Sequence, residues 1–162
     1  MAIISGGSKT HLFSVRSGNL TITDLILEHG KSDWGGALYV RATDASDQVL
    51  GKTSAHVHLL RSVVRKCEAR FAGAVFLVMD AVLVLEESVL ELNTASDGGG
   101  GAVMIDGGAT VVVTGGKTSF VRNNNATYGG GFLIRSESLP CDDPAACRQA
   151  RLDVSGMGTQ LV

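Results

Sequence analysis

The stretch SFVRNNNATYGGGFLI, residues 119–134, places a run of asparagines before three glycines and an apolar run. This order predicts a turn that leads directly into a strand. Two stretches align with it without a gap, at 25–40 and 62–77, and 88–105 fits with two extra residues at its glycines. The starts of the four units are 37, 26 and 31 residues apart. A fixed motif at uneven spacing is typical of a solenoid, whose coils stack in register while its outer loops vary in length.

A second apolar run precedes each unit: NLTITD, HVHLLR, AVLVLEE and ATVVVTGG. Each repeat therefore reads as strand, strand, turn and strand, and no helix-period segment or capping box interrupts the series. This pattern predicts an all-β chain folded as a parallel β-helix, with residues 1–162 as one domain and a loop insertion at 136–150. An antiparallel sandwich of short strands is the alternative, and the absence of Asn-Gly hairpin turns counts against it.

The alternation of side chains along a strand predicts which positions form the core. If the third position of each unit points inward, the fourth points outward. The predicted core column is Leu27, Val64, Leu90 and Val121. The outward column is Glu28, Arg65, Glu91 and Arg122. Its charge alternates, so neighbours about 4.8 Å apart attract one another and help to set the register. Exposed pairs of this kind add little to stability.

An aromatic residue precedes the glycines in three of the units: Trp34, Phe71 and Tyr128. We expect the glycines to be structural, because the backbone after the turn needs either a positive φ or a close approach to the next coil. A phosphate-binding loop does not fit, since no helix follows and no Lys-Ser/Thr completes the motif.

The composition excludes several classes of protein. With 14 Lys and Arg against 16 Asp and Glu, the chain lacks the basic excess that nucleic acids and anionic membranes attract. No apolar span approaches the roughly 18–20 residues that cross a bilayer. The N-terminus MAIISGGSKTHLF has neither the basic start nor the sustained apolar stretch of a signal peptide. We therefore expect no nucleic-acid partner, no transmembrane segment and no signal peptide in this chain.

Candidate catalytic acids occur only as adjacent pairs. Glycoside hydrolysis needs two carboxylates across a groove. Asp142 and Asp143 lie in a loop, and Glu86 and Glu87 lie at a strand end, where neighbours point to opposite faces. The stretch EHGK at 28–31 supplies a His-Gly pair without the other residues of a polygalacturonase-like site. We interpret these acids as solvated, and predict no catalytic residues and no cofactor.

Metal and disulfide chemistry rest on few residues. His56 and His58 alternate on one strand face and could chelate a metal, but no third ligand is evident. We interpret them as surface residues on either side of an inward Val57 and predict no metal site. Cys141 and Cys147 share the loop LPCDDPAACR, where either a disulfide or two reduced thiols fit the sequence.

Both faces of several strands are apolar. In the strands after the glycines, one parity must face inward, which leaves an outer column of Tyr39, Phe76, Met104 and Leu133. The runs AVLVL and TVVV place Val82, Val84 and Val112 on the outside of another wall. A solitary soluble protein rarely leaves such a stripe bare. We therefore expect an interface with a partner protein, a second subunit or further coils; the alternative is cover by the chain's own C-terminal segment.

The unit also carries a family resemblance. FVRN at 120–123 precedes GGGFLI, GGAL stands at 35–38 and GGAV at 100–103, while Val89, Leu90 and Asn93 give a looser version of Phe-x-x-Asn. This combination resembles the repeats of chlamydial polymorphic outer membrane proteins, over about residues 19–134. The resemblance implies a right-handed, single-stranded parallel β-helix of the pectin-lyase-like type, here of about five coils. It also implies a cell-surface or extracellular adhesin.

Taken together, these patterns favour a non-catalytic structural or protein–protein interaction module that docks through an apolar β-helix wall, as a subunit or segment of a larger assembly. The alternative is a surface adhesin or a carbohydrate-binding or carbohydrate-cleaving β-helix protein. A groove lined with aligned acids and aromatic residues would favour the alternative, whereas a flat apolar wall would favour docking.

Overall fold

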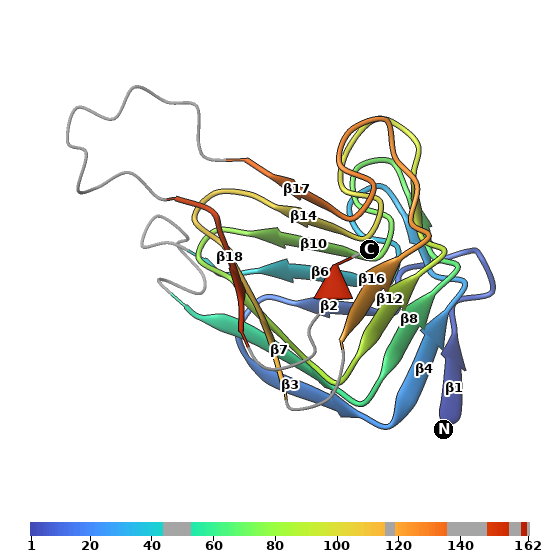
Figure 1. The fold of residues 1–162 in the computed structure, drawn as a ribbon, viewed down its shortest axis with the longest axis horizontal. Helices are drawn as coiled ribbons and strands as arrows, with labels where there is room; N and C mark the ends of the chain where they lie inside the picture. The colour runs from blue at the N-terminus through green and yellow to red at the C-terminus, as the bar shows by residue number, and fades with distance from the viewer. Residues whose placement is uncertain (44–52, 116–118, 136–148, 156–159, 162) are drawn as a thin grey trace.

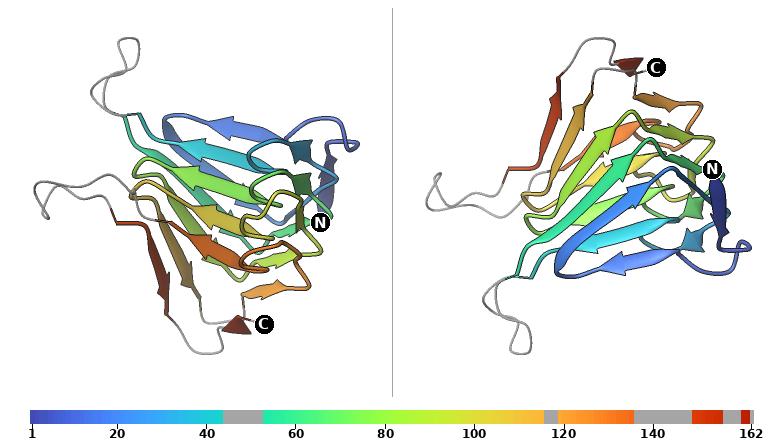
Figure 2. Two further views of the ribbon diagram at one scale, coloured as in Figure 1. Left: turned by 90° about the horizontal axis from the view of Figure 1, so that it is seen from above. Right: turned by 90° about the horizontal axis from the view of Figure 1, so that it is seen from below.

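The computed structural model describes residues 1–43, 53–115, 119–135, 149–155 and 160–161. Within these ranges every regular element is a β-strand and no helix occurs. The strands form three large sheets and one small sheet, in which neighbouring strands run parallel (Figure 1). In Figure 2 the repeats stack along one axis, with the blue N-terminal strands and the red C-terminal strands at opposite ends. This repeated parallel stacking is consistent with the predicted parallel β-helix and does not fit an antiparallel sandwich.

The sheets are named A to D. Sheet A has the order β1 (Ala2–Ser5), β4 (Leu25–Glu28), β8 (Val63–Arg65), β12 (Val89–Glu91), β16 (Phe120–Arg122) and β19 (Gln160–Leu161). Sheet B has the order β17 (Phe132–Ile134), β14 (Val103–Ile105), β10 (Val75–Val78), β6 (Leu38–Arg41) and β2 (Phe13–Val15). Sheet C has the order β18 (Arg151–Val154), β15 (Thr110–Thr114), β11 (Val82–Glu86), β7 (Ala55–Leu60) and β3 (Gly18–Thr23). Sheet D contains β13 (Thr94–Ala95), β9 (Glu68–Ala69) and β5 (Lys31–Ser32).

The strand registers confirm the alignment of the repeats. In sheet A, Ile26 pairs with Val63 and Val63 pairs with Val89. Phe120 continues the row from Val89. These separations of 37, 26 and 31 residues are those between the starts of the four sequence units. The loop insertion predicted at 136–150 lies almost entirely outside the described residues.

The predicted core column is also confirmed. Its four members are between 0% and 2% exposed: Leu27, Val64, Leu90 and Val121. Inward residues of sheets B and C join them in one continuous apolar cluster that runs through the stack. Because every repeat adds a layer of the same kind, the core grows along the stacking axis and needs no helix to cover it.

The corners between sheets use a backbone conformation that the sequence did not reveal. Seven residues other than glycine have φ between 46° and 56°, in two columns at the ends of sheet A. They are Asp24, Arg61 and Glu87 at the corner from sheet C, and His29, Lys66, Leu92 and Asn123 at the corner towards sheet D. A residue in the left-handed region turns the chain sharply within one position, so the strands before and after it meet at a sharp angle.

Gly36 and Gly73 meet the second of the two predicted requirements, close approach, whereas Gly129 has a positive φ of 52°. A Cβ built on Gly36 would lie 2.2 Å from the carbonyl oxygen of Gly73, and one on Gly73 would lie 2.0 Å from the carbonyl oxygen of Gly101. Neither glycine has a positive φ in this structure. Only a residue without a side chain therefore lets the turns of successive repeats stack directly on one another.

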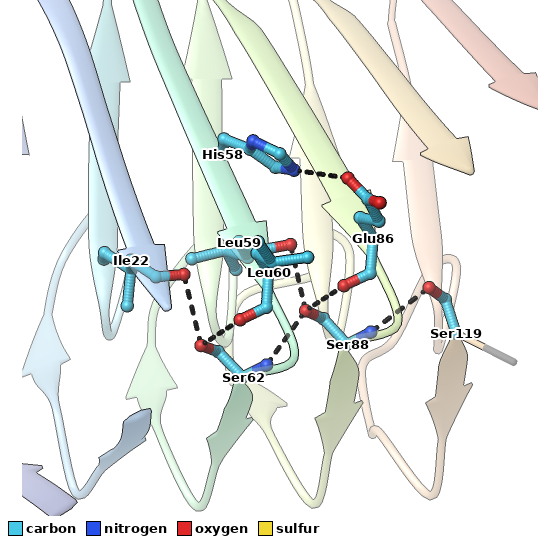
Figure 3. Close-up of polar contacts among 8 residues, drawn as sticks. All are labelled: Ile22, His58, Leu59, Leu60, Ser62, Glu86, Ser88 and Ser119. Carbon is cyan, nitrogen blue, oxygen red and sulfur yellow. Dashed lines mark hydrogen bonds and ion pairs between the residues drawn. The ribbon is translucent and has the colours of Figure 1, made fainter. Parts of the chain in front are cut away.

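A column of buried serines joins sheet C to sheet A (Figure 3). Ser88 accepts a hydrogen bond from the backbone N–H of Ser62 at 3.1 Å and donates to the carbonyl oxygen of Glu86 at 2.8 Å. Its own N–H donates to the hydroxyl oxygen of Ser119 at 3.2 Å. All three serines are 1% exposed. The hydroxyl groups therefore satisfy backbone groups that the sharp corner removes from the ladders of the sheets.

A second polar column lies at the corner after sheet A. The side-chain oxygen of Asn93 accepts a hydrogen bond from the N–H of Cys67 at 3.0 Å, and its amide donates to the carbonyl oxygen of Val64 at 3.1 Å. The same amide donates to the side-chain oxygen of Asn124 at 2.9 Å. Asn93 is fully buried, so each of these bonds replaces one that water cannot supply.

The asparagine column corrects the reading of the Phe-x-x-Asn motif. Val89 pairs with Phe120, so the residue in register with Asn93 is Asn124. Asn123, the last residue of FVRN, instead takes the left-handed corner position. The looser version of the motif, which ends at Asn93, is therefore offset by one residue from FVRN. The reason is that Asn123 at the corner and Asn124 in the buried column are adjacent in the chain.

The outward charged column of sheet A forms the expected ion pairs. Arg65 lies 2.8 Å from Glu28, and Arg122 lies 2.9 Å from Glu91. The hydrogen bond from Arg65 is the main cause that lowers the pKa of Glu28 below its ordinary value; its charge and the charges of nearby basic residues add to this, and burial opposes it. The alternation of sign therefore joins neighbouring strands in pairs.

We expect Asn93→Ala to lower the free energy of unfolding by about 2–4 kcal/mol, because it leaves the N–H of Cys67 and the carbonyl of Val64 buried without these partners. Urea unfolding followed by circular dichroism measures the change. Asn125→Ala is the matched control: Asn125 is exposed and bonds through its backbone, so its substitution should change stability by less than about 0.5 kcal/mol. Equal free energies of unfolding for the two variants would contradict a stabilising role of the buried asparagine column.

Arg65→Gln should raise the pKa of Glu28 towards its ordinary value, which a carbon-13 NMR titration of the side-chain carboxyl measures. Since the folded-state pKa is below the unfolded one, the pair stabilises the fold above the ordinary pKa of glutamate. That contribution is lost as the pH falls through the folded-state value. Arg122→Gln, which removes the partner of Glu91, should leave the Glu28 titration unchanged. An unaltered Glu28 pKa in Arg65→Gln would show that Arg65 does not cause the shift.

Candidate ligand-binding groove

The predicted outer column of sheet B exists as a continuous row. Tyr39 pairs with Phe76, Phe76 with Met104, and Met104 with Leu133. Ser14 precedes Tyr39 in the same row. The parity deduced from the sequence therefore holds, and the four apolar side chains lie on the face opposite the main core.

The middle of this row is covered by side chains of the chain's own turns; whether a partner contacts the rest of the row stays a prediction. Phe76 is 4% exposed and Met104 is 2% exposed. The ring of Trp34 lies 5.3 Å from that of Phe76, and the ring of Tyr39 lies 5.9 Å from it and nearly parallel. Phe71 also packs against this second apolar cluster. The residues before the glycines thus cover the row, because the turns bring them over sheet B.

The valines predicted on the other wall lie on the outer face of sheet C. Val82, Val84 and Val112 are half-buried. In register, Val84 and Val112 are flanked by His58 on one side and Asp153 on the other. The apolar part of this wall is therefore two strands wide and is bordered by polar side chains. Whether it contacts a partner stays a prediction.

A groove opens beside the aromatic cover of sheet B. Its volume is about 340 Å³. Its lining consists of Trp34, Tyr39, Arg41, Phe76, Val78, Met79, Asp106 and Arg135. These residues come from the turn before β6, from β6 and β10, and from the segments that follow β10, β14 and β17. A concave site with apolar walls and a few polar groups is the usual form of a small-ligand site.

The polar groups of the groove are held in place before any ligand arrives. Arg135 donates to a carboxylate oxygen of Asp106 at 2.7 Å, and the N–H of Gly107 donates to the other oxygen at 2.9 Å. The Nε of Arg41 donates to the sulfur of Met79 at 3.4 Å. Among the described residues, no carboxylate forms an ion pair with Arg41. The groove therefore carries a net positive charge.

Sequence reasoning named Tyr39 and Phe76 but missed the polar half of the groove. Arg41 lies two residues after Tyr39, so strand parity alone places both side chains on one face. Asp106 and Arg135 each follow an apolar strand directly. The repeat alignment could have joined them, because it ends at Ile105 and Ile134, which pair in β14 and β17 directly before these two residues.

A larger groove of about 600 Å³ crosses sheet D. Two ion pairs involve its lining: Lys31 with Glu68 at 3.0 Å, and Arg70 with Asp97 at 2.7 Å. No aromatic residue is among its described lining residues. Its charges are largely satisfied within the chain and its described lining holds no aromatic ring, so it is the weaker candidate.

The other predicted sites carry no chemistry in the described part of the chain. His56 and His58 lie on the outer face of sheet C on either side of Val57, which is 1% exposed. His58 is 3.0 Å from Glu86 (Figure 3), but no group of three His, Cys, Asp or Glu there could hold a metal ion. Asp142, Asp143, Cys141 and Cys147 lie outside the described residues.

Cys67 is the remaining candidate nucleophile. It is fully buried beside Asn93, and burial raises the pKa of its thiol to about 11. The thiol is therefore protonated at neutral pH and shielded from solvent, which makes it a packing residue.

Comparison with protein-family models, with curated proteins and with solved structures finds no match for this chain. The resemblance to polymorphic outer membrane protein repeats accordingly stays a prediction from the motif. The described residues contain no helix of the length and apolarity that crossing a membrane requires.

We expect Phe76→Ser to lower the free energy of unfolding by about 3–5 kcal/mol, because it removes a buried ring and leaves a hydroxyl among apolar groups. Trp34→Ala should cost only about 1–2 kcal/mol, since the indole is half exposed and contributes mainly its ring contacts. Urea unfolding of both variants tests this order. Tyr128→Ala, at a ring that is 64% exposed, is the control for loss of an aromatic residue. A Phe76→Ser variant as stable as Tyr128→Ala would show that the row is bare after all.

Proposed function

We propose that this chain is a non-catalytic binding module built on a right-handed parallel β-helix of about five coils, of the pectin-lyase-like type. The motif resemblance to polymorphic outer membrane protein repeats supports the handedness. Four aligned units and the flanking strands support the number of coils. Surface adhesion, which the same resemblance implies, is a setting in which such a module would act.

The observation that carries this proposal is the groove on sheet B. It combines half-exposed aromatic rings with a fixed acid and two arginines, which is the composition of a recognition site. The lining holds one acid and not a row of aligned acids, so its aromatic rings and concave shape are what favour ligand binding over docking through a flat apolar wall.

The size of the face supports a small or chain-like ligand. Five strands of three or four residues give sheet B an outer face of about 300 Å², at about 4.8 Å between strands and 3.3 Å per residue. A stable protein interface takes about 800 Å² from each partner. The groove volume of about 340 Å³ instead falls at the lower end of the range of small-molecule sites.

The same groove argues for binding without catalysis. Asp106 is the acid among its described lining residues, and it is engaged by Arg135 at 2.7 Å. Hydrolysis of a glycosidic bond uses two carboxylates across the bond, one of them protonated. A single acid paired with an arginine fits the role of a hydrogen-bond acceptor.

Docking of a protein partner, as a subunit of a larger assembly, is the second candidate. It rests on the outward, half-buried Val82, Val84 and Val112 of sheet C; Val84 pairs with Val112, and Val82 lies two residues before Val84 on the same strand. The apolar patch spans two strands, or roughly 100 Å², so a protein partner would need surface beyond these valines.

The proposal is tested with the labelled chain on arrays of immobilised glycans and synthetic peptides. The wild-type chain should retain at least one ligand that the double variant Trp34→Ala, Tyr39→Ser loses by roughly tenfold or more, as removal of two ring contacts predicts. Mass spectrometry of the ligand after incubation should show it intact.

Tyr128→Ala is the matched control, since it removes an exposed ring outside the groove, and it should bind as the wild type does. Two results would overturn the proposal. One is the failure to find any ligand that the groove variant binds less tightly. The other is recovery of the ligand in cleaved form.

A further inference from the structure

The outer face of sheet A carries an apolar row that lies apart from the groove of sheet B. Ile26 pairs with Val63, and Val63 pairs with Val89, so these outward side chains follow one another along the stack. Ile3 continues the row on β1 and is 55% exposed. The other three are half-buried, and in the described part of the chain they belong to neither of the two apolar clusters. The row is therefore apolar surface on the outside of the stack.

Charged side chains border this row on both sides. Two residues further along the strands lies the column of Glu28, Arg65, Glu91 and Arg122. Two residues earlier lie the corner residues Asp24, Arg61 and Glu87. Both columns begin with an acid and alternate in sign from repeat to repeat. A nucleic acid or an anionic lipid surface is a poor partner for this face, because it would meet acids as often as bases.

The order of the charges makes this face complementary to itself. A second copy can be turned by 180° about an axis that lies on the face, parallel to the strands and midway between β8 and β12. The stacks of the two copies are then antiparallel, and the same surface is used on both. Glu28 faces Arg122 of the second copy, and Arg65 faces its Glu91. Every member of this column therefore meets the opposite charge.

The neighbouring columns agree with the same axis. Arg61 faces Glu87 of the second copy. In the apolar row between the two charged columns, Val63 faces Val89. The central contacts are thus two sets of opposite charges with apolar side chains between them.

Other arrangements of the two faces bring like charges together. A displacement by one strand places Arg65 over Arg65 and Glu28 over Glu91. With the axis along the stack, the column that begins at Asp24 faces the column that begins at Glu28, acid over acid and base over base. Repulsion in these alternatives selects the antiparallel arrangement and its register.

The ion pairs within the chain leave room for contacts between copies. Arg65 donates through Nε to Glu28 at 2.9 Å, and its side chain is still 31% exposed. A guanidinium has five N–H donors and a carboxylate has about four acceptor positions. Each group can therefore bind one partner in its own chain and one on the facing copy.

The size of the face limits the strength of the contact. Four strands with five positions each give about 300 Å², at about 4.8 Å between strands and 3.3 Å per residue. A stable interface takes about 800 Å² from each partner, whereas smaller contacts are typical of transient association. The charge pattern, and not the area, is what indicates a second copy.

We propose that two copies of this chain associate reversibly through the outer faces of sheet A, with their stacks antiparallel and Arg65 of each copy paired with Glu91 of the other. The proposal does not depend on the groove of sheet B, which belongs to a different wall of the stack (Figure 1).

Sedimentation velocity of the intact chain at rising concentration measures this association. The mean mass should rise from that of one chain towards that of two. The dissociation constant should be roughly tenfold or more higher in about 500 mM salt than in about 20 mM salt, because salt screens the charges across the interface.

Two charge-swapped variants test the geometry. The first is Glu28→Arg with Arg65→Glu, and the second is Glu91→Arg with Arg122→Glu. Each variant keeps an ion pair within its own chain but places like charges at all four contacts of this column across the axis. The self-association of each variant should therefore weaken by roughly tenfold or more.

An equimolar mixture of the two variants should associate again, because every swapped position of one variant faces the opposite charge on the other. This rescue separates a contact between copies from a role of the charges in folding, which mixing does not restore. Circular dichroism checks that each variant is folded. Lys31→Glu with Glu68→Lys swaps an exposed ion pair of sheet D and is the matched control, which should associate as the wild type does.

Val63→Lys and Val82→Lys give a second comparison that leaves every ion pair in place. Val63→Lys puts a charge into the apolar row of sheet A and should weaken association by roughly tenfold or more, since it would face Val89. Val82→Lys makes the same change on the outer face of sheet C and should have no effect.

Three results would overturn the proposal. One is a wild-type chain that stays monomeric at about 1 mM. Another is association that survives either swap or Val63→Lys, which would place the contact on another wall. The third is a mixture of the two folded swap variants that stays monomeric.

Discussion

Parallel, in-register stacking is the constraint on which the rest of this structure depends. Each side chain lies about 4.8 Å from the equivalent side chain of the next repeat, so the side chains of one column must make favourable contacts at that distance. Apolar side chains meet this condition by packing against one another. Glutamate meets it by forming an ion pair with arginine, as Glu28 does with Arg65. Buried polar residues do so by exchanging hydrogen bonds, as Asn93 does with Asn124.

The corners between the sheets determine how the turns lie over the groove. Left-handed residues at the ends of sheet A bend the chain sharply. The buried serine and asparagine columns form hydrogen bonds with the backbone groups exposed by the bend. Beyond them, Gly36 and Gly73 allow the turns to stack at distances that a Cβ would prevent. The turns then carry Trp34 and Phe71 over sheet B, where they cover Phe76, and Trp34 lines the groove.

The arginines of the surface differ in the groups that they contact. Most described arginines of the outer surface form an ion pair with a carboxylate, as Arg61 does with Asp24 of the neighbouring repeat at 2.9 Å. Such pairs are solvated and contribute mainly to register. Arg41 differs in the described part of the chain, where its Nε donates to the sulfur of Met79 and no carboxylate pairs with it.

The sequence alone determined the repeat, its register, the inward column from Leu27 to Val121 and the alternating charges beside it, because strand parity and parallel stacking turn a linear pattern into rows. It placed Tyr39 and Phe76 on the outer face of sheet B, but named a partner or the C-terminal segment as their cover. It offered two roles for the glycines and did not reveal the left-handed corners. The repeat alignment already places Asp106 and Arg135 next to each other, directly after the paired Ile105 and Ile134. Only the tertiary structure decided that the turn aromatics cover sheet B and line one groove with these charges, because the position of the turns over the sheet depends on their backbone path, which no local spacing records.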